Sequence, residues 1–160
     1  YSAFRLEHRY WSFGESIEST VGAKLFDNST HEYETLVWLA DTDPLQLDAT
    51  SPLDVVLQRY LVANFYFATN GAAWTDNFNF MSALDVCDWN DETSGIFCNE
   101  DGKVTRILMQ KCNLEGTIPH DIGLLSDMKV INVTGNKLEG DIPVSLGIMS
   151  SLKSIDLSKS

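Results

Sequence analysis

Residues 104–127 of this chain are VTRILMQKCNLEGTIPHDIGLLSD, and residues 128–151 repeat the pattern as MKVINVTGNKLEGDIPVSLGIMSS. The two segments align without a gap at a period of 24 residues, and both contain the run L-E-G-x-I-P. A partial third copy, LKSIDLSKS, occupies residues 152–160. Self-similarity at a fixed period of this length predicts a repeat architecture, in which each copy is one coil that packs on the next.

Each repeat opens with a segment that favours a β-strand. Ile107 and Met109 alternate with Leu108 and Gln110, as expected for a strand with one buried face. Equivalent strands of successive repeats should therefore lie side by side in a parallel sheet. Their outward-facing positions form rows, which are a candidate partner-binding surface unless they are simply solvent-exposed. The rows are Arg106, Val130 and Ser154; Leu108, Asn132 and Asp156; Gln110, Thr134 and Ser158; and Lys111, Gly135 and Lys159.

The repeats resemble those of plant-type leucine-rich-repeat proteins, whose pattern is L-x-x-L-x-L-x-x-N-x-L-x-G-x-I-P. The resemblance covers residues 104–160, with Val104 and Met128 in place of the first Leu and Cys112 in place of Asn. It implies that Asn136 points inward and satisfies backbone groups of the neighbouring coil. It also implies that Cys112 is a buried small residue and neither a nucleophile nor a metal ligand.

The family resemblance implies an α/β fold: a leucine-rich-repeat solenoid with a short parallel sheet on its concave face and a helical N-terminal cap. In this family the concave face is the usual recognition surface. The third repeat is incomplete, so we expect either further repeats beyond it or a partner chain at the open strand edge of residues 152–158.

Residues 51–103 are expected to form the cap. Ser51 and Pro52 predict the start of a helix, with Ser51 as its N-cap and Pro52 in the first helical position, and Asn70-Gly71 predicts its end near residue 69. The later part resembles the C-x-W…G-V-x-C cap of plant-type repeats. The resemblance implies a Cys87–Cys98 disulfide, and hence an oxidising compartment; two reduced thiols are the alternative.

Residues 1–50 are expected to be a partly helical N-terminal extension. Phe4, Tyr10, Trp11 and Phe13 are too many aromatic residues for a disordered tail, so this segment should pack on the cap or on a partner. Residues 31–40, HEYETLVWLA, predict a short helix that Ser29 or Thr30 caps.

Three short runs are similar to leucine-rich-repeat proteins of diatom algae. They are Trp38-Leu39-Ala40 with Asp43-Pro44, Leu57-Gln58-Arg59-Tyr60, and Thr69-Asn70-Gly71 ahead of Trp74. With the cap and the repeats, this similarity extends from about residue 35 to the end of the chain. It carries no defined biochemical function.

The charge distribution excludes several classes of partner. The net charge is -12, divided into -13 for residues 1–102 and +1 for residues 103–160. Nucleic acid and anionic membranes are unfavourable partners for so acidic a chain.

The longest apolar stretch, residues 55–68, is interrupted by Gln58, Arg59 and Asn64 and is too short to span a bilayer. Residues 1–10 do not resemble a signal peptide, although the chain begins without Met.

The sequence shows no motif for catalysis or for a cofactor. Phosphate-binding glycine loops and nucleophile elbows are absent, and the three histidines are far apart. An acidic group in the cap is conceivable as a calcium site, but a solvated acidic surface explains it better. Its members are Asp85, Asp88, Asp91, Glu92, Glu100 and Asp101. Two N-x-S/T triplets, at Asn28 and Asn132, are candidate glycosylation sites.

We therefore expect a protein–protein recognition module that catalyses nothing, binds no metal or cofactor, and is a secreted or cell-surface leucine-rich-repeat ectodomain. The alternative is an accessory or structural subunit of a larger assembly, for example in an organelle. The partner would contact the concave face, the aromatic N-terminal segment or the open C-terminal edge. A glycan on Asn132 would stand on the concave face and obstruct a flat partner.

Overall fold

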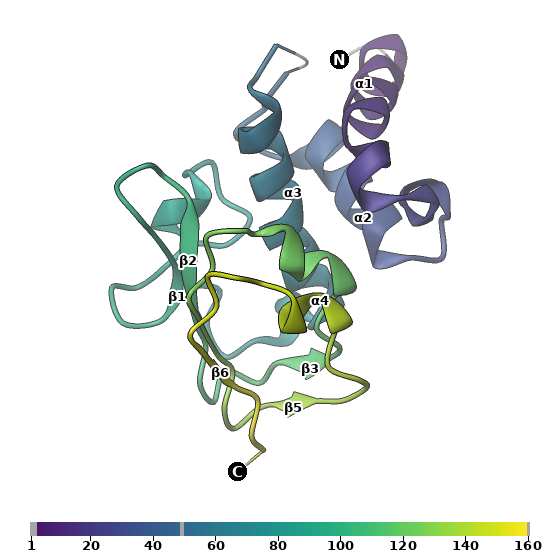
Figure 1. Cartoon of the computed structure of the whole chain (residues 1–160). Helices are drawn as coiled ribbons and strands as arrows, with labels where there is room; N and C mark the ends of the chain where they lie inside the picture. Colours follow the sequence, from purple (N-terminus) through teal and green to yellow (C-terminus); the bar gives the residue numbers. More distant parts are fainter. Residues whose placement is uncertain (1–2, 49, 160) are drawn as a thin grey trace.

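The computed structural model describes residues 3–48 and 50–159, with side chains from residue 9 onwards (Figure 1). The chain begins with helices and continues into two small sheets. In Figure 1 the larger sheet has the helices on one side only. Its other face is open.

The N-terminal extension contains more helix than its sequence pattern indicates. Helix α1 (Ala3–Val21) leads through a 3₁₀ turn (Ala23–Phe26) into α2 (His31–Val37), which continues as a π-helical segment (Trp38–Thr42). The side-chain oxygen of Thr30 accepts a hydrogen bond from the Tyr33 backbone N–H at 3.1 Å, so Thr30, and not Ser29, caps α2.

Helix α3 (Leu53–Ala68) is the central element, and its start differs from the prediction. Pro52 is the capping residue and Leu53 is the first helical one, so Ser51 as N-cap was wrong. The reason is local: the Ser51 hydroxyl accepts a hydrogen bond from the Asp48 backbone N–H in the preceding turn. The helix ends as predicted, because Asn70 adopts the left-handed conformation (φ 57°) that stops it. Two 3₁₀ turns follow, at Gly71–Ala73 and Val86–Asp88.

The larger sheet has the strand order β1-β2-β4-β6. The strands are β1 (Gly95–Cys98), β2 (Val104–Leu108), β4 (Val130–Asn132) and β6 (Ser154–Asp156). β1 is antiparallel to β2, and β2, β4 and β6 are parallel. Ile107 pairs with Ile131 and Ile131 with Ile155, so each strand lies one 24-residue repeat from the next. The strand predicted at the start of each repeat is therefore present.

Each of the two complete repeats also contributes a short strand to a second sheet on the opposite side of the coils. There, β3 (Glu115–Gly116) and β5 (Lys137–Leu138) form a second parallel sheet. A 3₁₀ turn (His120–Leu124) and the short helix α4 (Val144–Gly147) close the two complete repeats. Residues 104–127 and 128–151 each make one coil in this way, and residues 152–159 begin a third.

Inward-facing residues of the coils form a core that is continuous with that of the helices. Ile107, Met109, Ile131 and Val133 are almost fully buried, and so are Tyr60 and Trp89 of the cap. Asn136 lies within this core, as the repeat pattern predicts. Its side-chain oxygen accepts from the backbone N–H groups of residues 112 and 114, and its amide donates to the carbonyls of residues 109 and 133.

Candidate functional site

The open face of the larger sheet carries the residues predicted to bind a partner. Pairing places Arg106, Val130 and Ser154 in one row and Leu108, Asn132 and Asp156 in the next. Backbone hydrogen bonds from Lys111 N–H to Thr134 O and from Gly135 N–H to Ser158 O extend the same register. The remaining predicted residues therefore follow in further rows: Gln110, Thr134 and Ser158, then Lys111, Gly135 and Lys159. We call these four rows the open face.

One end of the open face carries an exposed cation on an aromatic ring. The guanidinium of Arg106 lies over the Phe97 ring, 4.7 Å from its centroid. Phe97 belongs to β1, directly beside Arg106 in the antiparallel pair. Such a contact holds the planar guanidinium in place while its N–H groups stay available to a ligand. The repeat pattern does not point to Phe97, because β1 lies outside the repeat.

The middle of the open face is a ladder of oxygen-bearing side chains. The Asn132 side-chain oxygen accepts from the Thr134 hydroxyl at 2.7 Å, and Asp156 accepts from the Ser158 hydroxyl at the same distance. The hydroxyl and backbone N–H of Ser158, together with the Thr134 hydroxyl, lower the pKa of Asp156. The ladder thus offers hydrogen-bond acceptors, with one carboxylate near the sheet edge.

The two candidate glycosylation sites lie in different surroundings. Asn28 is exposed in the turn before α2, where Thr30 caps that helix. Asn132 is half-buried on the open face, and among the described residues no acceptor is within hydrogen-bond reach of its side-chain nitrogen. An N-linked glycan would be attached to that nitrogen.

The cysteines divide into a bonded pair and a buried thiol. Cys87 and Cys98 form a disulfide with a Cα–Cα distance of 5.4 Å, the pairing that the cap resemblance implies. Cys112 is 4 % exposed. Burial, followed by the charges of Asp91 and Asp76, raises the pKa of Cys112 to about 11. It is therefore a protonated thiol at neutral pH and a poor nucleophile.

Two of the acidic residues of the cap, Asp85 and Asp91, stabilise its turns. Asp85 accepts from the Cys87 backbone N–H, and Asp91 accepts from the backbone N–H groups of Thr93 and Ser94, which lower the pKa of Asp91. Within residues 3–48 and 50–159, no three Asp, Glu, His or Cys side chains are arranged to hold a metal ion. The same residues include no helix that is long and apolar enough to cross a bilayer.

A buried ion pair joins the extension to the cap, and sequence analysis did not predict it. The Arg59 guanidinium donates to both carboxylate oxygens of Asp43 at 2.6 Å, and to the carbonyls of Ser82 and Leu84. Arg59 is 2 % exposed, and its guanidinium contacts the rings of both Trp38 and Trp89, at 5.4 and 4.9 Å from their centroids. In the sequence, the one indication of this ion pair is that the charged residue Arg59 lies within the apolar stretch of α3.

A second buried polar cluster joins α3 to the first coil. The Asn64 side-chain amide donates to Asp121 at 3.3 Å, and the Thr35 hydroxyl donates to the Asn64 oxygen at 2.9 Å. The Tyr60 hydroxyl is fully buried beside them, without a hydrogen-bond partner in the described part of the chain. Burial is the main reason that the pKa of Asp121 is raised to about 6. Burial also raises the pKa of Tyr60.

The predicted aromatic segment packs mostly within the extension. Phe13 is buried, and Tyr10 contacts Trp11, Phe26 and Tyr33 edge-on. Trp11 stacks on Phe26 and remains 49 % exposed. The side chain of Phe4 lies outside the described residues.

The third predicted surface, at the C-terminal edge, is apolar. β6 pairs with β4 on one side only. Ile142, Val144 and Ile148 are 62 %, 79 % and 81 % exposed, and Ile155 is exposed as well. A hollow of about 300 Å³ lies beside them. It is lined by Ile118, Leu138, Glu139, Gly140, Asp141, Ile142, Leu157 and Lys159.

Comparison with known proteins supports a leucine-rich-repeat relationship over part of the chain. A segment of 63 residues, 39 % of this chain, is 36 % identical to a probable leucine-rich repeat receptor-like protein kinase of Arabidopsis thaliana. That segment covers 6 % of the plant protein. No protein-family model matches the chain, and no solved structure matches it.

Proposed function

We propose that this chain is the N-terminal cap and the first coils of a leucine-rich-repeat solenoid whose concave face recognises another protein. The observation that carries the proposal is the open face itself: parallel strands in 24-residue register that present aligned rows of outward-facing residues, exposed or half-buried. The partial similarity to a receptor-like kinase fits a role in protein interaction. The open face is then the concave face of the solenoid.

We further propose that the module is not an enzyme. The free thiol is buried and protonated, and the one carboxylate of the open face, Asp156, already accepts hydrogen bonds from neighbouring hydroxyls. What the face offers is a set of cations, acceptors and half-buried apolar positions, which suits binding.

Photo-crosslinking from single positions tests the binding surface. p-Benzoylphenylalanine would replace Gln110 on the open face, Trp11 on the extension or Val144 at the C-terminal edge, with exposed Glu115 on the second sheet as the control. We expect a discrete adduct from Gln110 in material from the source cells, and none from Glu115. Adducts from Trp11 or Val144 alone would reject the open face as the binding site.

A structural subunit of a larger assembly is the second candidate function. The exposed side chains of Ile142, Val144 and Ile148 favour it, because a cluster of exposed apolar side chains often marks a contact with another protein. In the crosslinking experiment this function predicts a strong Val144 adduct at fixed stoichiometry with one protein. It also predicts that the Gln110 position gives none.

We also propose an oxidising, extracellular or secretory location. The Cys87–Cys98 disulfide and the N-x-S/T triplet at exposed Asn28 support it. Alkylation of unfolded protein before and after reduction, followed by mass spectrometry, should label Cys112 alone first and all three cysteines afterwards. Labelling of Cys87 and Cys98 before reduction would contradict this location.

A further inference from the structure

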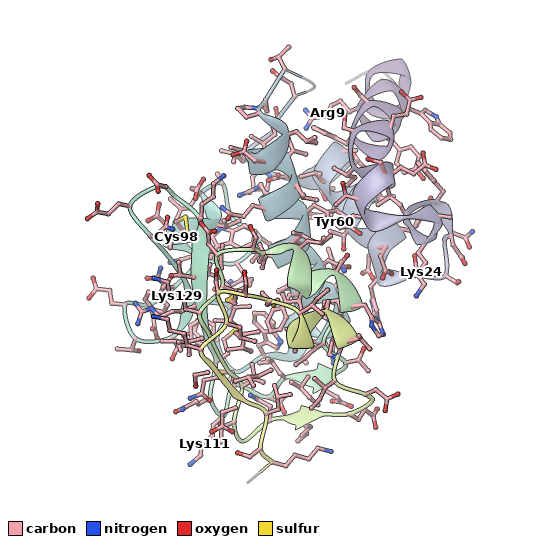
Figure 2. All side chains as sticks on the ribbon, in the orientation of Figure 1. Arg9, Lys24, Tyr60, Cys98, Lys111 and Lys129 are labelled. Atoms are coloured by element: carbon pink, nitrogen blue, oxygen red, sulfur yellow. A yellow bond between two sulfur atoms is a disulfide. The ribbon has the colours of Figure 1, made fainter. Side chains whose placement is uncertain are left out.

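The basic residues of the coils are concentrated on one side of them. Residues 103–160 contain seven Lys and Arg residues, and five of these are exposed on or beside the open face. They are Arg106, Lys111, Lys129, Lys153 and Lys159. Figure 2 shows Lys111 and Lys129 extending from the sheet on the side away from the helices. Glu115, Glu139 and Asp141 lie on or beside the second sheet instead.

The repeat itself places these cations in register. Lys153 N–H donates to the Lys129 carbonyl across the β4–β6 pair, and the two residues are 24 apart. Lys111 and Lys159 occupy the same position two repeats apart, in the last row of the open face. The sequence contained this signal, because each of these two positions holds lysine in two of the three repeats.

None of the five cations is neutralised within the part of the chain that the structure describes. The ion pairs there are His31–Glu34, Arg59–Asp43 and Lys103–Asp54. Asp156 is the one acid in the four rows of the open face. Three of the five cations lie in these rows against that one carboxylate, and Lys129 and Lys153 lie beside them, on a chain whose net charge is -12.

The positions of the cations set the shape of a complementary ligand. Lys129, Lys153 and Arg106 lie where the strands begin, and Lys111 and Lys159 lie beyond their other ends. The two groups are separated by at most about 20 Å, since a strand rises roughly 3.3 Å per residue. Three strands at about 4.8 Å spacing make the surface only about 10 Å wide. Between the two groups lie Leu108, Asn132 and Thr134, which are uncharged, and the Asp156 carboxylate on β6, which would repel an acid placed at the centre.

We propose that the open face binds an acidic segment of a protein partner, in which acidic residues at both ends flank an uncharged centre. This inference rests on the proposed function and specifies the partner's chemistry. Opposite charges across such an interface would speed encounter and fix the register of the bound segment. The extended peptide would lie along the strands, with its acids at the two groups of cations.

Charge on the neighbouring cap argues against larger polyanions. Glu100 and Asp101 are exposed in the turn between β1 and β2, and residues 1–102 carry a net charge of -13. A nucleic-acid duplex brings one negative charge per about 1.7 Å of its axis, so it would meet these carboxylates as well as the lysines. A short acidic segment can lie on the open face without reaching them.

Selection from a random peptide library displayed on phage, with the whole chain as bait, tests the proposal. We expect enriched peptides with two acidic positions separated by about four to six neutral residues. The dissociation constant of the best peptide should rise roughly tenfold or more in the Lys129→Glu/Lys153→Glu variant. The control Lys137→Glu, at an exposed lysine on the second sheet, should bind as the wild type does.

The outcomes separate this inference from the function on which it rests. Non-acidic peptides whose binding is lost in Leu108→Arg would overturn the charge preference but support recognition by the open face. Peptides insensitive to Leu108→Arg and to both lysine changes would overturn both proposals. Equal binding of duplex DNA or phosphatidylserine vesicles, with the same sensitivity to the lysine changes, would overturn the protein-segment proposal. If the first double variant misfolds by circular dichroism, Lys111→Glu/Lys159→Glu provides the same test.

Discussion

The helical half of this chain and its coils are stabilised in different ways. In the coils, the same contacts recur every 24 residues: an inward apolar pair, a backbone ladder and a parallel strand. The helical half depends on one arrangement that occurs once, in which Arg59 joins Asp43 to the loop carbonyls of Ser82 and Leu84. A defect in a coil should therefore stay local, whereas a defect at Arg59 should loosen segments that are far apart in sequence.

The largest effect is expected from Arg59→Met. The change leaves the Asp43 carboxylate buried without its cation and removes the donors to two loop carbonyls. Breaking a buried pair in this way costs about 3–5 kcal/mol of folding free energy. Urea denaturation measures the loss. Hydrogen exchange should rise in α1, α2 and the loop at residues 82–84, and stay nearly unchanged in β4.

The matched controls separate the buried charge from lost packing. Asp43→Leu/Arg59→Met removes both charges and should be more stable than Arg59→Met alone. Lys103→Met breaks the exposed pair with Asp54 and should leave the denaturation midpoint nearly unchanged. If Arg59→Met costs less than about 1 kcal/mol, the pair is not what holds the extension to the cap.

The corresponding test in the coils is Asn136→Ala. It removes the acceptor for the backbone N–H groups of residues 112 and 114 and the donor to the carbonyls of residues 109 and 133. Buried groups left without partners cost about 1–3 kcal/mol each, and relaxation of the coil limits the total to about 3 kcal/mol. Denaturation gives the magnitude, and hydrogen exchange gives the location.

For Asn136→Ala we expect faster exchange in residues 109–114 and 133–136, with α1 and α2 protected as before. Asn28→Ala, at an exposed asparagine, controls for loss of an amide side chain. Faster exchange throughout the extension would show that the two halves unfold as one unit, and would remove the contrast between them.

Periodicity explains which parts of this structure the sequence could predict. Strand positions, row membership and the inward Asn136 all follow from a pattern that repeats, so one local rule applies in every coil. The start of α2 was also predictable, because Thr30 precedes a helical stretch and supplies a capping oxygen.

The remainder depends on contacts between distant residues. Asp43 and Arg59 are 16 residues apart, and Asn64 and Asp121 are 57 apart, with no spacing rule to connect them. Helix α1 interleaves apolar with charged and polar residues and buries Phe13 and Ile17 against the rest of the fold, which no spacing rule indicates. The similar runs at Trp38, Asp43, Arg59 and Trp74 lie in or near the aromatic core of the cap, but their sequence alone did not show that they would meet.

Asp121 connects the two halves of the chain. Of the substitutions at Arg59, Asn136 and Asp121, the one at Asp121 is expected to change the stability least. It lies in the first coil, accepts a hydrogen bond from Asn64 of α3, and has the buried Tyr60 hydroxyl nearby. Burial, and next the charge of Glu32, raise its pKa to about 6 from the ordinary 3.8, although the Asn64 hydrogen bond lowers it. The folded protein therefore binds a proton at this carboxyl more readily than the unfolded chain does.

The sign of the pH dependence follows from that difference. A raised pKa in the folded state contributes stability that is fully present below about pH 4 and is lost as the pH rises through about 6. Asp121→Asn should therefore be more stable than the wild type at pH 7.5, by about 1–2 kcal/mol after allowing for partial solvent exposure, and should gain nothing at pH 4. Asp141→Asn, an exposed acid on the second coil, controls for removing one negative charge from an acidic chain. An equal gain from both variants would mean that net charge, and not the junction between α3 and the first coil, determines the effect. A gain confined to Asp121→Asn above pH 6 would identify this carboxyl as the point where coil and cap are coupled.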